Sequence, residues 1–304
     1  MVRSGADTME LPLQKIRTEM RGLAGLAQLP FRHQTWRGQT GQMLGTGTGS
    51  SLDFQDHRPY FPGDDPRGIN WQAYARTGVY TMKLYRDEVS PRLDLIMDAS
   101  ASMFLDQTKA ICSARLLYFC LESALLHGAS VRLYLLTAAG VCLVQPEEFD
   151  TLDLSGDNGG QNAADIPPNL TPAAWLPQIP VRMGSLRVWI TDLLFESAPD
   201  TILPHLINNR GRGLIFSPFS IGESEPDWTG NTEFIDAESP TRRHQNVTGS
   251  LLRDYKSSYA RHFELWKLHS RKLGIALTRI HAERPLRDEL VRNALPQGAV
   301  ELLA

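Results

Sequence analysis

The fold is decided by the stretch Leu93-Asp94-Leu95-Ile96-Met97-Asp98-Ala99-Ser100-Ala101-Ser102. Its first half is a short apolar run of the kind that forms a buried β-strand. Its second half, from Asp98 onward, is a polar turn. A helix is predicted next, because apolar residues between Ile111 and Leu125 recur at helical spacing. A strand that runs through a tight polar turn into a helix is typical of α/β proteins.

Strands and helices continue to alternate after this unit. Strand-like runs occupy residues 131–136, 141–144, 186–190, 214–216, 234–235 and 275–280. Helical patterns occupy residues 201–208, 248–273 and 285–295, and Thr248 is placed to cap the second of these. This order predicts an α/β fold of Rossmann type, with a mostly parallel sheet covered by helices on both faces.

The region before the first strand is organised differently. Residues 10–29 have the apolar spacing of a short amphipathic helix, and residues 41–51 are rich in Gly and Thr, which predicts a flexible loop. Residues 53–88 form an extended segment dense in Arg, Asp, Gly and aromatic residues, with strand-like alternation only near its end. We therefore divide the chain into an N-terminal region, 1–90, and an α/β domain, 91–304.

Composition excludes several classes of protein. The chain has 304 residues, of which 42% are hydrophobic and 21% charged, so it is long and apolar enough for a sizeable core. A formal net charge of −3 argues against a strongly basic nucleic-acid binder. Neither a signal peptide nor a run of about 18 apolar residues is found, so we expect a cytoplasmic protein without a membrane span. Its three cysteines lie in apolar stretches and are expected to be buried.

Two of the predicted strands end on oxygen-bearing side chains. The first leads into Asp98, Ser100 and Ser102, and the strand at 186–190 ends on Thr191 and Asp192. Ligands of open α/β sheets bind beyond the carboxyl ends of the strands, and carboxylates with hydroxyls suit a hard cation such as Mg²⁺. The alternative is structural: the serines cap the following helix and Asp98 accepts backbone hydrogen bonds.

This pattern resembles a known metal site. Asp-x-Ser-x-Ser after the first strand, with Thr-Asp after a later one, is similar to the metal-ion-dependent adhesion site of von Willebrand factor A domains. The resemblance implies that Mg²⁺, or another divalent cation, is held by Asp98, Ser100, Ser102 and Asp192. It also implies a threonine from a middle loop, for which Thr171 is the candidate.

A longer motif lies upstream. Residues 45–54, 58–71, 75–78 and 83–88 resemble the signature of a bacterial family known as domain of unknown function 58. The resemblance implies a von Willebrand A-like α/β domain and a partner among the MoxR-type AAA+ ATPases, for which such proteins look like adaptors or effectors in complex assembly or protein maturation. It also implies that the following residues form the family signature and a candidate partner surface: Arg58, Tyr60, Gly63, Asp64, Asp65, Arg67, Trp71 and Arg76.

Two interpretations of this signature segment remain open. It is either an ion-pair network that pins an extended segment onto the domain, or a surface that recognises a partner, since Arg, Tyr and Trp dominate interface hot spots. Burial of Arg67 and Trp71 would favour the first interpretation.

Enzyme motifs are missing from the sequence. It contains no phosphate-binding loop of the form GxxxxGK[ST], no GxSxG elbow and no HExxH pair. We therefore expect a non-enzymatic interaction module that works with a protein partner. The alternative is a metal-dependent hydrolase that uses Asp98 and Asp192, for which no general base is evident.

Overall fold

The computed structural model describes residues 11–31, 43–48, 54–149, 152, 154, 172–237 and 241–303. Its main helices are α1 (Leu13–Ala24), α2 (Trp71–Thr77), α3 (Gln107–Leu126), α4 (Pro199–Ile202), α5 (Ile221–Ser224), α6 (Gly249–Lys272) and α7 (Leu286–Glu289). Shorter helical turns include η2 (Pro66–Gly68), η3 (Ala101–Met103), η6 (Pro172–Gln178), η7 (Leu203–Leu206), η8 (Leu290–Ala294) and η9 (Leu295–Gln297).

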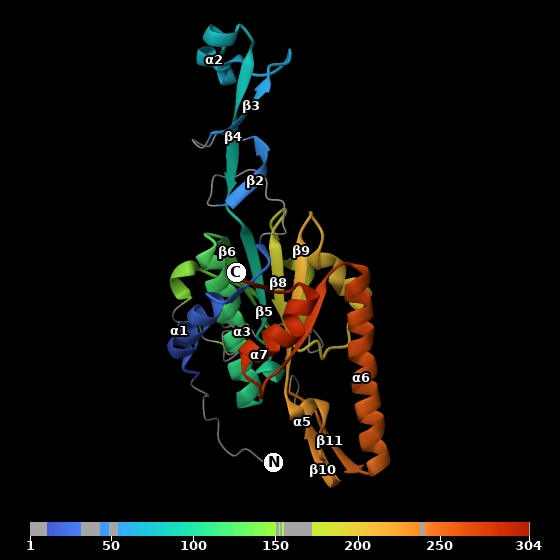
Figure 1. Cartoon of the computed structure of the whole chain (residues 1–304). Coiled ribbons are helices and arrows are strands. Elements are labelled where there is room, and N and C mark those ends of the chain that lie inside the picture. The colour runs from blue at the N-terminus through green and yellow to red at the C-terminus, as the bar shows by residue number, and fades with distance from the viewer. Residues whose placement is uncertain are drawn as a thin grey trace.

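A six-stranded sheet forms the centre of the molecule (Figure 1). Its strands are β5 (Arg92–Asp98), β6 (Ser130–Thr137), β7 (Gly140–Val144), β8 (Leu186–Ile190), β9 (Arg212–Phe219) and β12 (Ala276–His281). Their order is β12-β9-β8-β5-β6-β7, and all pairs are parallel except β6–β7. The predicted mostly parallel α/β sheet is confirmed. Strand order reverses between β5 and β8, which is where doubly wound sheets bind ligands.

Helices cover both faces of this sheet, as predicted. One core cluster joins α1, α3 and α7 to one face and includes Met20, Leu117 and Leu290. The other joins η6, η7 and α6 to the opposite face and is centred on the fully buried Trp189 and Trp266. Burial on both faces explains why most residues of β5 and β8 are apolar.

Helix α1 shares the core of the α/β domain. Besides its apolar contacts with α3, its Arg17 and Arg21 each donate from Nε to the buried Glu122 of α3, at 2.6 and 2.8 Å. The interface between α1 and α3 therefore combines apolar packing with two ion pairs. Helix α1 thus packs on the α/β domain although it precedes the signature segment in the sequence.

The signature segment forms an arm that stands off the amino edge of the sheet (Figure 1). We use "the arm" for β3 (Phe54–Pro59), η2, α2 and β4 (Thr81–Val89), in which β3 and β4 pair antiparallel. A further strand, β2 (Met43–Thr48), pairs with the other edge of β4. The prediction of a flexible loop at 41–51 is therefore wrong for these six residues, because pairing with β4 uses backbone groups that every residue here has, Gly included.

A second antiparallel pair lies beyond the carboxyl edge of the sheet (Figure 1). It consists of β10 (Gly230–Ile235) and β11 (Arg242–Val247). The sequence predicted only a short strand here, because β11 is mostly exposed and carries no apolar alternation. The short strands β1 (Ala27–Gln28) and β13 (Glu301–Leu302) also pair with each other.

Two expectations about exposure have different outcomes. Cys112 and Cys120 are buried as predicted, but the prediction for Cys142 is wrong, because β7 is an edge strand and this side chain faces outward. Among the described residues, no helix combines the length and apolar character that a bilayer span requires.

Candidate cation site and partner surface

The candidate metal residues meet at the carboxyl edge of the sheet. Asp98 is the last residue of β5, and Thr191 and Asp192 directly follow β8, its neighbour at the point where strand order reverses. The structure thus brings Asp98, Ser100, Ser102 and Asp192 to one edge. Thr171 lies outside the described residues.

Asp98 is held by hydrogen bonds on both carboxylate oxygens. The Ser100 backbone N–H donates to Oδ1 at 3.0 Å, and the Thr191 hydroxyl donates to Oδ2 at 2.8 Å. The side chain is 2% exposed. Thr191 therefore links the two strand ends, a role that its position next to Asp192 did not reveal.

The carboxylate of Asp98 has no ion-pair partner among the described residues, and its pKa is raised. Burial, together with repulsion from Asp192, raises the pKa of Asp98 to about 7, although the hydrogen bonds from Ser100 and Thr191 oppose the rise. A buried carboxylate in this state is stabilised by any cation that approaches it. This edge therefore favours cation binding over anion binding.

The turn after β8 is conformationally unusual. Leu193 is a buried, non-glycine residue with φ of 60°, in the left-handed region that such residues rarely adopt. Its N–H donates to the Thr191 hydroxyl, and its carbonyl oxygen lies 2.7 Å from Nε2 of His262 on α6. A strained backbone conformation that is stabilised by its surroundings is common in binding sites. Here the strained residue directly follows Thr191 and Asp192 and is hydrogen-bonded to Thr191.

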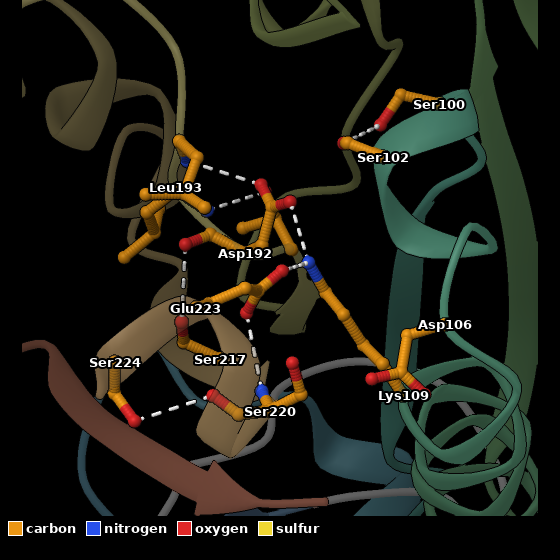
Figure 2. Close-up of polar contacts among 12 residues, drawn as sticks. Ser100, Ser102, Asp106, Lys109, Asp192, Leu193, Ser217, Ser220, Glu223 and Ser224 are labelled. Carbon is orange, nitrogen blue, oxygen red and sulfur yellow. Dashed lines mark hydrogen bonds and ion pairs between the residues drawn. The ribbon is translucent and has the colours of Figure 1, made fainter. Parts of the chain in front are cut away.

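Asp192 is paired with a lysine that the sequence analysis missed. Lys109 of α3 is fully buried, and its Nζ donates to Asp192 Oδ2 at 2.9 Å and to Glu223 Oε1 of α5 (Figure 2). Burial alone would lower the pKa of Lys109, but Asp192 and Glu223 raise it above its ordinary value. Burial also raises the pKa of Glu223, against the effect of Lys109. The charge of Asp192 is thus compensated from within the chain.

The remaining donors fit a small hard cation. The hydroxyl oxygens of Ser100 and Ser102 are 3.1 Å apart. Neighbouring ligands of an octahedral Mg²⁺, at 2.0–2.1 Å from the ion, are separated by about 2.9 Å. Among the described residues no three His, Cys, Asp or Glu side chains gather into a metal-binding group, so a cation here depends on these hydroxyls and Asp98.

Apolar side chains lie around this polar centre. The segments that follow the neighbouring strands β5, β8 and β9 at the carboxyl edge expose Leu105, Leu194 and Ile221 by 62%, 42% and 53%. Large apolar residues around a polar centre are typical of a protein-binding surface.

The arm exposes the second group of predicted residues. Trp71 is 59% exposed, Phe61 is 61% exposed, and Arg67 and Arg76 are exposed as well. The ring of Trp71 meets Tyr74 and Tyr80 edge-on, while Tyr74 and Tyr80 stack at 4.3 Å. The aromatic residues therefore form an ordered outer surface, and the exposure of Arg67 and Trp71 favours the partner-surface interpretation.

Hydrogen bonds fix the shape of the arm. Arg58 forms two bonds of 2.7 Å with Asp64, which also accepts from the Phe61 N–H, and these contacts lower the pKa of Asp64 to about 2. Asp65 accepts from the Arg67 N–H and so caps η2. Gly63, whose φ is 108°, allows the chain to turn just before these two aspartates.

The two positive groups nearest the aromatic surface are uncompensated. Within the described part of the chain, the guanidinium groups of Arg67 and Arg76 have no ion-pair partner. Tyr60 is half-buried and contacts Tyr80. The predicted network thus reduces to one ion pair, Arg58–Asp64, which shapes the surface and leaves the other arginines open.

Comparisons with known proteins give a family and a weak structural likeness. No curated protein matches the chain. A crystal structure described as the conserved hypothetical protein BatB from Bacteroides thetaiotaomicron is similar at a TM-score of 0.32 and 8% identity, over 69% of this chain and 97% of that chain. Residues 56–146 match the family model described as "Protein of unknown function DUF58". This match contains most of the arm and the Asp98 turn, so this part of the chain is similar to the DUF58 family.

Proposed function

We propose that the protein is a non-enzymatic interaction module that holds a divalent cation at Asp98, Ser100 and Ser102 and thereby accepts a carboxylate from a partner protein. The observation that carries the proposal is the buried Asp98 carboxylate, which lies at the topological switch point and has no cationic partner in the part of the chain that the structure describes. Mg²⁺ is the cation that this set of oxygens fits best.

Each residue has a distinct part in this proposal. Ser100 and Ser102 supply neutral hydroxyl ligands, and Asp98 supplies the negative charge. Asp192 adds a negative potential, but Lys109 compensates most of it. A cation bound by so little protein charge keeps affinity for an outside carboxylate, which is the chemistry that the bound ion would supply.

The resemblance to MoxR-associated proteins suggests the partner. We propose that it is a MoxR-type AAA+ ATPase, for which this chain acts as an adaptor or effector. The exposed apolar residues at the carboxyl edge and the aromatic surface of the arm support a protein partner, because both have the composition of binding surfaces. They lie at opposite edges of the sheet (Figure 1), so two proteins could be bound together.

The hydrolase alternative is less well supported. A general base must be free to take a proton from water. Asp192 accepts hydrogen bonds from Lys109 and from the Leu194 N–H, so both of its oxygens are engaged. Asp98 is buried and bonded on both oxygens. Neither carboxylate is placed as a base toward solvent.

Binding of a purified MoxR-type ATPase from the same organism tests the proposal. We expect a complex in the presence of Mg²⁺ that is lost on chelation and on Asp98→Ala substitution. Glu225→Ala is the matched control, since Glu225 is an exposed acidic residue beyond the same sheet edge, and it should bind as the parent does. Equal binding by Asp98→Ala, or hydrolysis of an ester or phosphate substrate that depends on Asp192, would contradict the proposal.

A further inference from the structure

A cleft lined by both polar and apolar side chains lies on the α6 side of the sheet, at its β12 edge. It has a volume of about 390 Å³, which is within the range of small-molecule sites. Its walls come from β9, β12, α6 and the C-terminal helical turns, and they include Phe219, Phe263, Lys267, Arg279, Asn293 and Gln297. None of these residues belongs to the candidate cation site.

Arg279 of β12 is fixed in this cleft by aromatic rings. Its guanidinium carbon lies 4.0 Å from the centroid of Phe219, 3.6 Å from that of Phe263 and 5.0 Å from that of Tyr259. The Tyr259 hydroxyl also accepts a hydrogen bond from Nη2 at 2.5 Å. Rings packed against the guanidinium leave its N–H groups, which lie in its plane, directed at the edges.

Arg279 forms no ion pair within the described residues. Its Nε is buried and has no hydrogen-bond partner there. Tyr259 stays neutral, because burial raises its pKa to about 12. Burial also lowers the pKa of Arg279, although interactions with Tyr259 and Glu223 oppose this decrease. An arginine placed at such a cost is normally paired with an anion.

The other Lys, Arg and Glu side chains that line the cleft form ion pairs with one another. Lys267 lies 3.5 Å from Glu264, and Arg284 lies 3.4 Å from Glu289. Glu289 is buried and also accepts from Asn293 Nδ2. Arg279 is thus the one cation of the described cleft without a carboxylate partner, and the excess charge of the cleft is positive.

We propose that this cleft binds a small oxyanion ligand, one that carries a carboxylate or phosphoryl group, through the caged guanidinium of Arg279. The planar fork of an arginine matches the oxygens of either group, and a guanidinium already held by rings loses little entropy on binding. Lys267 and the amide of Gln297 line the same cleft and can contact the remainder of the ligand. The proposal does not depend on the cation site, since it uses none of its residues.

Calorimetric titration with inorganic phosphate and with citrate, in buffer free of divalent cations and at constant ionic strength, tests this proposal. We expect saturable binding of at least one of the two, and which one binds separates phosphoryl from carboxylate ligands. Arg279→Gln should weaken that binding at least about tenfold, because it removes charge-assisted hydrogen bonds. Arg287→Gln, which changes an exposed arginine of the neighbouring α7, should leave it unchanged, as should Asp98→Ala.

A measurement on the unsubstituted protein covers the case in which Arg279→Gln does not fold. The Nε–H resonance of Arg279 should shift on addition of the anion, with the affinity that calorimetry gives. Absence of binding by both anions would overturn the proposal. So would binding that leaves the Arg279 resonance unmoved, or equal binding by Arg279→Gln.

Discussion

The ammonium group of Lys109 lies 2.9 Å from the carboxylate of Asp192, at the sheet edge where the sequence places a metal ion. The buried ammonium group of Lys109 thus neutralises one of the two candidate carboxylates, while no cationic side chain of the described residues pairs with Asp98. The two halves of the predicted site are therefore unequal. Asp192 belongs to a buried ion cluster that joins α3, the end of β8 and α5, whereas Asp98 has no ion-pair partner among the described residues.

Removal of Lys109 should destabilise the protein strongly. Lys109→Met leaves Asp192 buried without its counter-ion, and breaking such a pair costs about 3–5 kcal/mol. Urea unfolding followed by circular dichroism measures this change. The control is Arg242→Met, since Arg242 and Glu233 form an exposed pair, and it should cost less than about 1 kcal/mol. Equal effects of the two substitutions would show that the Lys109 cluster is not a structural unit.

The pKa of Asp98 predicts how stability depends on pH without divalent cations. The unfolded chain loses this proton near pH 3.8, whereas the folded protein keeps it until about pH 7. Between these values the folded state binds more protons, so the free energy of unfolding falls as pH rises, by at most about 1.4 kcal/mol per pH unit. Above pH 7 this contribution is constant.

Asp98→Asn should remove that slope and should raise stability at pH 8. Thermal unfolding of both proteins at pH 5 and pH 8 gives the comparison. Addition of Mg²⁺ should stabilise the parent protein at pH 8 and leave Asp98→Asn unaffected. A parent protein that is no less stable at pH 8 than Asp98→Asn would show that Asp98 is compensated by other means.

Within the arm, Arg58 should control the titration of Asp64. The hydrogen bonds from Arg58 are the largest cause of the low pKa of Asp64, about 2, and the Phe61 N–H is the next. The Arg58–Asp64 interaction is therefore present above about pH 4 and is lost as pH falls toward 2. Arg58→Gln should raise the pKa of Asp64 by more than about one unit, as measured by NMR titration of the carboxyl carbon. An unchanged pKa would mean that the pair does not form in solution.

The aromatic surface of the arm should matter for binding and not for folding. Trp71→Ala should change the free energy of unfolding by less than about 0.5 kcal/mol, because the side chain is 59% exposed. It should weaken binding of the ATPase by about thirtyfold or more, as expected for a tryptophan hot spot. Leu268→Ala on α6, where the side chain is 52% exposed, is the control and should do neither. Unchanged binding by Trp71→Ala would assign the arm a different role.

The local sequence pattern was enough to predict the central sheet and the part of the candidate cation site that follows β5. The strand and turn at 93–102 are contiguous, so the position of Asp98, Ser100 and Ser102 at a strand end followed directly from the apolar run before them. Helix α6 was likewise predicted with its cap at Thr248, because its apolar face recurs over 24 residues. Exposed strands such as β11 gave no such signal, since their side chains are polar on both faces.

Ion pairs between residues far apart in the chain could not be predicted from the sequence pattern. Lys109 is separated from Asp192 by 83 positions and from Glu223 by 114, and it lies in a helix whose other buried residues are mostly apolar. The cage of Arg279 similarly draws rings from β9 and α6. Such clusters arise from topology, because the sheet order and not the local pattern decides which side chains meet.

Isothermal titration of Mg²⁺ into the purified protein at pH 8 shows whether Asp98, Ser100 and Ser102 hold a divalent cation. We expect saturable binding of one ion per chain that is lost in Asp98→Ala and weakened in Ser102→Ala, while Glu225→Ala binds as the parent does. Absence of binding in the parent protein, or equal binding by the parent and Asp98→Ala, would contradict this expectation.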